Sequence, residues 1–171
     1  NKNSSSALLW QSELIIKNRD DNFIIGSKSK FNNLIEIFIK VKDSPGLFYK
    51  LLKLLEHTGL EVIDANIFTS IKKEFAANTF ITKYSRHNRV LKKSELIELT
   101  SKIKINFNKF DKIEISNSNM IDNSKFEKII KIDESIIKDK KRNLITIETV
   151  DSSGLLANIA KVFFDNNVSI Y

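Results

Sequence analysis

The sequence predicts an α+β fold in which a small antiparallel sheet carries two helices on one face. Three observations lead to this prediction. Residues 35–42 alternate between apolar and mostly polar side chains, which is typical of a strand with one buried face. A turn that contains Pro45 and Gly46 follows, and an amphipathic stretch with helical spacing begins directly after it. Two further strand-like segments and a second helical stretch then follow in the order expected for such a sheet.

The segment before residue 31 is predicted to lie outside this sheet. Residues 7–17 have apolar side chains at helical spacing after a serine-rich stretch, so we expect a helix there. Residues 18–22 form a polar break, and the short apolar run that follows is interpreted as part of a linker. We therefore interpret residues 1–30 as the end of an upstream catalytic region and its linker.

Six elements are predicted from residue 34 onward. The first helix is supported by a stripe of leucines, and Gly59 stands at a position suited to a left-handed C-cap. In the second helix, Ser94 is a candidate cap. The order β-α-β-β-α-β is the ferredoxin-like plan, in which four antiparallel strands carry two helices. The elements are strand 34–42, helix 47–58, strands 60–71 and 75–84, helix 92–105 and, after a linker at 117–124, strand 126–137.

An internal repeat is the clearest feature of the sequence. Residues 34–63 recur without a gap as residues 142–171, which indicates a duplicated module. The sequence ends within the second copy, so we expect it to be a fragment of a longer protein. We predict a first repeated domain at 31–137 and the truncated start of a second at 138–171. The turn of the first copy, Asp43, Ser44, Gly46 and Leu47, corresponds to Asp151, Ser152, Gly154 and Leu155 in the second.

The composition argues against several classes of function. An apolar content of 42% in 171 residues is enough for a core. No apolar stretch suits a membrane span or a secretory signal, so we expect no membrane association. Cysteine is absent and His57 and His87 lack clustered partners, so no metal site is expected and a reducing cytoplasm is compatible. The net charge of +7 comes from dispersed lysines mixed with acids, so we expect no nucleic-acid binding.

The turn Asp43, Ser44, Pro45, Gly46 and Leu47 is the candidate binding site. Backbone N–H groups at a helix start attract a carboxylate, and the helix dipole favours negative charge there. Gly46 allows close approach to the backbone, and Asp43 can pair with an ammonium group. A free amino acid carries both charges, and both need partners when water is removed. In the alternative, Asp43 or Ser44 caps the helix and Pro45 occupies its first position, so that the turn is structural.

Three segments together resemble an ACT domain. They are Asp-Ser-Pro-Gly-Leu-Phe at 43–48, Ile-Asp-Ala-Asn-Ile-Phe-Thr-Ser at 63–70, and Asn-Thr-Phe at 78–80. The Phe-Thr-Ser ending of the second segment resembles, more narrowly, the tandem ACT region that ends bacterial bifunctional uridylyltransferase/uridylyl-removing enzymes. Leu9-Trp10 also resembles the segment after the HD phosphohydrolase domain of that family. The sequence departs from the family pattern at Ser153, Asn78 and Gln11, where proline, aspartate and histidine are usual.

The resemblance implies a glutamine sensor that regulates an enzyme acting on the PII signal protein. It implies that the effector lies between the turn and the second strand of a paired module, with Asp64, Asn66 and Ile67 as the opposite wall. ACT–ACT pairing, within the chain or in a dimer, is also implied. The Mg²⁺ or Mn²⁺ of the catalytic domains is implied upstream, and neither catalytic motif occurs here, so we expect no catalysis by this segment. Two alternatives stay open: a structural module that joins domains or subunits edge to edge, and the ACT tail of an amino-acid biosynthetic enzyme.

Overall fold

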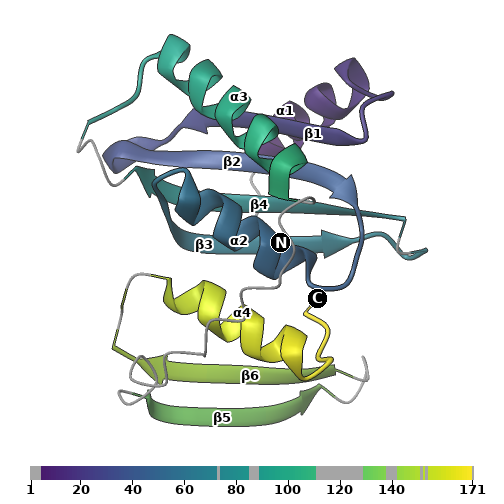
Figure 1. Cartoon of the computed structure of the whole chain (residues 1–171), viewed down its shortest axis with the longest axis vertical. Coiled ribbons are helices and arrows are strands. Elements are labelled where there is room, and N and C mark those ends of the chain that lie inside the picture. Colours follow the sequence, from purple (N-terminus) through teal and green to yellow (C-terminus); the bar gives the residue numbers. More distant parts are fainter. Residues whose placement is uncertain are drawn as a thin grey trace.

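The computed structural model of the chain describes residues 5–72, 74–84, 89–110, 129–137, 142–150, 152 and 154–170. The predicted linker at 117–124 lies outside these residues. Figure 1 shows the elements in chain order: α1 (Ser5–Lys17), β1 (Phe23–Ser29), the short 3-10 helix η1 (Phe31–Asn33), β2 (Leu34–Lys42), α2 (Leu47–His57), β3 (Leu60–Thr69), β4 (Phe75–Tyr84), α3 (Lys93–Phe110), β5 (Ile129–Ile137), β6 (Arg142–Thr149) and α4 (Leu155–Asp165).

The strands form two antiparallel sheets. The larger has the order β1-β2-β4-β3, and the smaller consists of β5 and β6. The alternating residues of β2 determine which face is buried, because Ile37 and Ile39 are fully enclosed on the side that carries α2 and α3. The α+β fold class is therefore confirmed, with a β-α-β-β core that is consistent with the ferredoxin-like plan.

The predicted identity of the fourth strand is wrong. Its place at the edge of the larger sheet is taken by β1, which lies in the segment interpreted as a linker and pairs antiparallel with β2. The strand predicted at 126–137 is β5, and it pairs with β6. Only the short segment 138–141 separates β5 from β6, so their pairing closes a much smaller loop than pairing with β2 would. The division of the chain into three regions stays a prediction.

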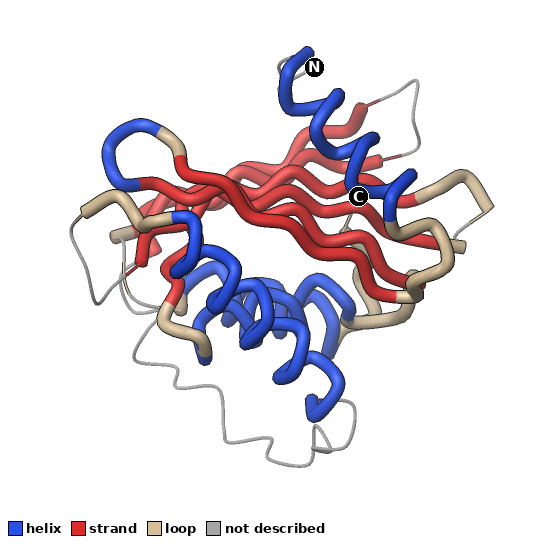
Figure 2. The backbone as a smooth tube through the Cα atoms, turned by 90° about the horizontal axis from the view of Figure 1, so that it is seen from above, coloured by secondary structure: helices blue, strands red, loops and turns tan. Residues whose placement is uncertain are grey.

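The larger sheet is covered on both faces. Figure 2 shows α1 alone on one side of the strands and the other long helices on the opposite side. The contact with α1 is specific: the Trp10 ring meets Phe38 edge to face, and Gln11 Nε2 donates a 3.1 Å hydrogen bond to Thr79 Oγ1. Gly26 provides the space for α1, because a Cβ at that position would overlap Leu14. The helix α1 thus contacts β4 at Thr79, on the face of the sheet opposite to α2 and α3.

A buried carboxylate lies on this same face of the sheet. Glu36 is 1% exposed, and its Oε2 lies 2.7 Å from Lys30 Nζ while its Oε1 lies 3.5 Å from Lys28 Nζ. Lys28 also stands over the Trp10 ring at 4.3 Å from the centroid. A buried charge needs such partners, because its desolvation is otherwise uncompensated. The edge strand β1 and the segment after it therefore supply the cations that allow Glu36 to be buried.

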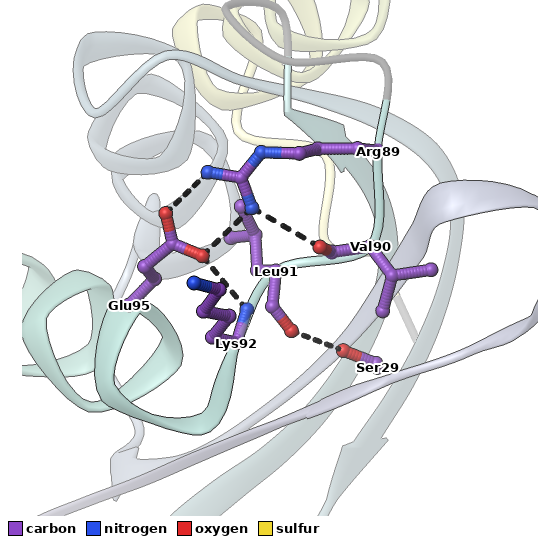
Figure 3. Close-up of polar contacts among 6 residues, drawn as sticks. All are labelled: Ser29, Arg89, Val90, Leu91, Lys92 and Glu95. Atoms are coloured by element: carbon purple, nitrogen blue, oxygen red, sulfur yellow. Dashed lines mark hydrogen bonds and ion pairs between the residues drawn. The ribbon is translucent and has the colours of Figure 1, made fainter.

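The helix α3 is fixed at its N-terminus by an acidic side chain three residues into the helix (Figure 3). Glu95 accepts a 2.8 Å hydrogen bond from the backbone N–H of Lys92 and pairs with the guanidinium of Arg89. The hydrogen bonds from Arg89, and then that from Lys92, lower the pKa of Glu95 to about 2. Just before the helix, the Leu91 carbonyl accepts a hydrogen bond from Ser29 Oγ of β1. The cap predicted at Ser94 is thus supplied by Glu95, because the helix begins at Lys93.

The structural repeat includes one more strand in each copy than the repeat seen in the sequence. Each copy consists of an antiparallel strand pair followed by a helix, β1-β2-α2 in the first and β5-β6-α4 in the second. The helix starts match in detail: Leu47 N–H donates to the Ser44 carbonyl at 3.1 Å, and Leu155 N–H donates to the Ser152 carbonyl at 3.1 Å. The helices α2 and α4 pack against each other, and Ala157 and Ala160 of α4 belong to the same core as β2. The two repeats therefore share one hydrophobic core.

Candidate functional site

The turn between β2 and α2 has a left-handed backbone at Gly46, with φ = +72°. Helix α2 consequently begins at Leu47, two residues later than a helix with Pro45 at its first position. No side chain of the described residues caps this helix, so the expected capping roles of Asp43 and Ser44 are not present in the structure. The explanation of the turn by capping alone therefore fails.

The first turn of α2 leaves backbone donors for an external group. The Leu47 N–H bonds to the Ser44 carbonyl and the Lys50 N–H to the Gly46 carbonyl. For the N–H groups of Phe48 and Tyr49, the described part of the chain supplies no acceptor. Uncapped amides at a helix N-terminus, together with the helix dipole, form a suitable site for a carboxylate.

A cavity of about 470 Å³ lies at this turn. Its volume falls within the range of small-molecule sites in proteins, roughly 300–1,000 Å³. The β2–α2 turn and the start of α2 form one side, β3 and β4 form the floor, and the C-terminal end of α4 with the segment after it forms the other side. Its lining residues are Asp43, Ser44, Pro45, Gly46, Leu47, Phe48, Tyr49, Ile67, Thr69, Ala76, Asn78, Ala160, Phe164, Asn167, Val168, Ser169 and Ile170.

The second repeat supplies the wall opposite the turn. The Phe164 ring packs so closely on Gly46 that a Cβ there would lie 2.7 Å from two ring carbons. After α4, Asn167 has φ = +58° and directs the chain back along the cavity toward Ile170. Residues 168–170 correspond to residues 60–62, the start of β3, in the first repeat. The wall opposite the turn is thus formed by the second repeat, in a segment that corresponds to the start of β3 but has no strand assigned to it.

Two of the three residues predicted for that wall lie elsewhere. Ile67 lines the cavity, whereas Asp64 and Asn66 do not. Asn66 pairs with Thr79 and Asp64 with Ile81, on the face of the sheet that α1 covers in part. Successive side chains of a strand point to opposite faces, so Ile67 and Asn66 cannot both face the cavity.

The second turn differs from the first in its neighbour. Asp151 lies outside the described residues, and Ser152, Gly154 and Leu155 do not line the cavity. A Cβ at Gly154 would lie 2.8 Å from Oε1 of Glu56, so a carboxylate of the chain itself stands beside this helix start. At the first turn the equivalent neighbour is the uncharged Phe164. No acidic side chain is as close to Gly46 as Glu56 is to Gly154, although Asp43 lies three residues before Gly46 in the same turn.

Local periodicity does not single out the cavity residues on β4 and beyond α4, although the repeat relates residues 168–170 to the start of β3. Asn78 belongs to the Asn-Thr-Phe segment that carries part of the family resemblance and is itself a departure from the family pattern. It is 1% exposed, and its side-chain Nδ2 has no partner in the described structure. Of the lining residues that the structure describes, Asp43 alone is charged. In the described parts of the chain, no group of three or more His, Cys, Asp or Glu is arranged to hold a metal ion. No helix among them is long and apolar enough to cross a membrane.

The fold and the cavity define a class of protein: a ferredoxin-like α+β repeat with a small-molecule-sized cavity between its copies. The chain is similar to proteins named bifunctional uridylyltransferase/uridylyl-removing enzyme. It is 25% identical to the one from Vibrio parahaemolyticus, 24% to that from Acinetobacter baylyi and 23% to that from Acinetobacter baumannii, each over 99% of the chain. The chain spans about 20% of the length of these relatives. No protein-family model and no solved structure matches it.

Proposed function

We propose that this chain is the amino-acid-sensing regulatory region of a bifunctional uridylyltransferase/uridylyl-removing enzyme, with glutamine as the effector. The similarity to enzymes of that name over 99% of the chain supports the parent protein. The cavity between the two repeats carries the sensing part of the proposal, because it combines uncapped helix amides, which can bind a carboxylate, with the acidic residue Asp43, which can pair with an ammonium group. Under this proposal the whole enzyme acts in the cytoplasm on the PII protein, and this region controls it.

In this proposal the ligand is bound through the α-carboxylate and the α-ammonium group that all free amino acids carry. Its α-carboxylate accepts from the amides of Phe48 and Tyr49 at the uncapped start of α2. Its α-ammonium pairs with Asp43, which is among the residues that line the cavity. The turn at Gly154 is a poorer candidate, because Glu56 already places a negative charge there. The first turn is therefore the proposed site.

Binding also provides a means of regulation. The cavity is formed by residues of both repeats, so a bound amino acid links α2 to the end of α4. A ligand that contacts both repeats favours the arrangement in which they are packed as in this structure. The enzyme would respond to the change in that arrangement.

Isothermal titration calorimetry of the 171-residue chain with L-glutamine tests the proposal. Asp43→Asn removes the partner of the ammonium and should weaken binding about tenfold, or about 1.4 kcal/mol. Asp20→Asn is the matched control, because Asp20 is exposed and paired only at the surface with Arg19. Saturable binding that only Asp43→Asn weakens supports the site. No heat of binding with any free amino acid would overturn it.

A second candidate function is a structural module that joins subunits edge to edge. The outer edge of β3, ten residues long, is paired with no described strand, and Ile63 and Phe68 on it are more than half exposed. An open edge of this length invites pairing with a second chain. Light scattering that shows a dimer, together with a chain that binds no amino acid, would favour this function over sensing.

A further inference from the structure

Asn78 is a buried polar side chain that the fold leaves unsatisfied. It lies in the middle of β4, where it pairs with Ile39 on one side and Ile67 on the other. Its side chain is directed to the same face as theirs, and it lines the cavity with Ile67. Asn78 is 1% exposed, and its Nδ2 donates to no described group.

Such a residue is unfavourable in the free protein unless something else uses it. A buried donor without an acceptor loses its hydrogen bonds to water and gains none in return. Its neighbours on the sheet are apolar, so an aliphatic side chain would suit the position better in the absence of a ligand. Its place on the floor of the cavity, across from the start of α2, puts the side-chain amide beside the space that a ligand would occupy. The Nδ2 atom itself exposes less than 1 Å², so the amide has to turn toward the cavity to donate to a ligand.

The charges around the cavity restrict what that ligand can be. Among the described residues of the lining, Asp43 is the only charged one, and none is a lysine or an arginine. An amino acid with a neutral side chain matches this arrangement, because Asp43 takes its ammonium and the helix start takes its carboxylate. A ligand with an acidic side chain would bring a second negative charge into a site without a cation to pair with it.

We infer that Asn78 is a specificity-determining residue, which donates its Nδ2–H to the side-chain oxygen of a neutral, amide-bearing amino acid. This inference rests on the proposed function and extends it to the part of the ligand that differs between amino acids. Acidic ligands are disfavoured by charge. Purely apolar ligands are disfavoured because they leave Nδ2 without an acceptor, and a site built for a hydrogen bond rejects analogues that lack it.

Calorimetry with three ligands on three proteins tests the inference. L-glutamine, L-glutamate and L-methionine are compared on the wild-type chain, on Asn78→Leu and on Asn66→Leu. Asn66→Leu is the matched control, because the same substitution is made on the neighbouring strand but on the opposite face of the sheet. The wild type and the control should bind L-glutamine at least tenfold more tightly than the other two. Asn78→Leu should lose most of the preference over L-methionine, and its melting temperature without ligand should be equal to or above that of the wild type.

The possible results separate the inference from the function on which it rests. If the wild type binds an amino acid but Asn78→Leu keeps the full preference for L-glutamine, the role of Asn78 is refuted and the sensor remains. If the wild type binds no amino acid, both are refuted. A large drop in melting temperature for both Asn78→Leu and the smaller Asn78→Ala would assign the side chain to folding and overturn the inference. Asn78→Ala, which removes the donor without adding bulk, should show the same loss of preference if Asn78→Leu does not fold.

Discussion

Replacing Gly46 with alanine tests whether the cavity is built by both repeats. The φ of Gly46 is +72°, and a residue with a side chain at such a φ is strained by about 1–3 kcal/mol. The added Cβ would lie 2.7 Å from two carbons of the Phe164 ring, so the ring has to move, which costs about 1–3 kcal/mol more. We therefore expect Gly46→Ala to lower the free energy of unfolding by about 2–6 kcal/mol.

A double-mutant cycle separates the two contributions. In a chain that already carries Phe164→Ala the ring is gone, so Gly46→Ala should cost only the backbone strain, about 1–3 kcal/mol. Gly154→Ala is the matched control: its φ is +75°, but the nearest group is the flexible carboxylate of Glu56, which can move away. Urea unfolding followed by circular dichroism gives the free energies. A coupling between Gly46 and Phe164 below about 0.5 kcal/mol would refute the packing of α4 on the first turn.

Three further substitutions test polar and packing interactions of the first repeat that lie away from the cavity. The pKa of Glu95 is lowered from 4.5 to about 2, chiefly by the hydrogen bond from Arg89, so its stabilising contribution is present above pH 4.5 and is lost as the pH falls toward 2. Glu95→Gln should therefore reduce the dependence of urea unfolding on pH between 4.5 and 2. An unchanged pH dependence would contradict the interaction between Glu95 and Arg89. Lys30→Met removes the nearer cation of the buried Glu36 and should cost about 1–3 kcal/mol, whereas an unchanged melting temperature would contradict the burial of that charge. Gly26→Val should displace α1 while the core strands stay protected in hydrogen exchange, and unchanged protection of α1 would argue against its close packing.

Local patterns were enough to predict the elements around the first turn. The alternation of β2 and the leucine stripe of α2 are properties of short segments, and each is read directly from the sequence. The hairpin of β3 and β4 was predicted for the same reason. By contrast, β1 has only a short apolar run, Phe23 to Ile25, before Gly26 and a polar end, so its pattern resembles a linker. Its place in the sheet depends on β2, which is a tertiary contact.

The candidate site was predicted only in part, because local sequence patterns reveal its turn but not the tertiary contacts that complete it. The turn at Gly46 is local, and its residues do line a cavity. The other wall depends on how the repeats pack, which periodicity does not reveal. Asn66 and Ile67 were assigned to one wall although adjacent strand residues face opposite sides, and this error was avoidable from the sequence. The repeat itself also held a usable signal, because it relates residues 168–170 to the start of β3.

A titration of ¹⁵N-labelled chain with L-glutamine, followed by two-dimensional NMR, tests most directly whether an amino acid binds between the two repeats. Saturable shifts are predicted for the amides of Phe48 and Tyr49 at the start of α2 and for Ile170 on the opposite wall, because these residues line the cavity. The amides of Gly154 and Leu155 at the second turn should shift little. An unchanged spectrum at saturating L-glutamine, or shifts confined to the second turn, would contradict the site.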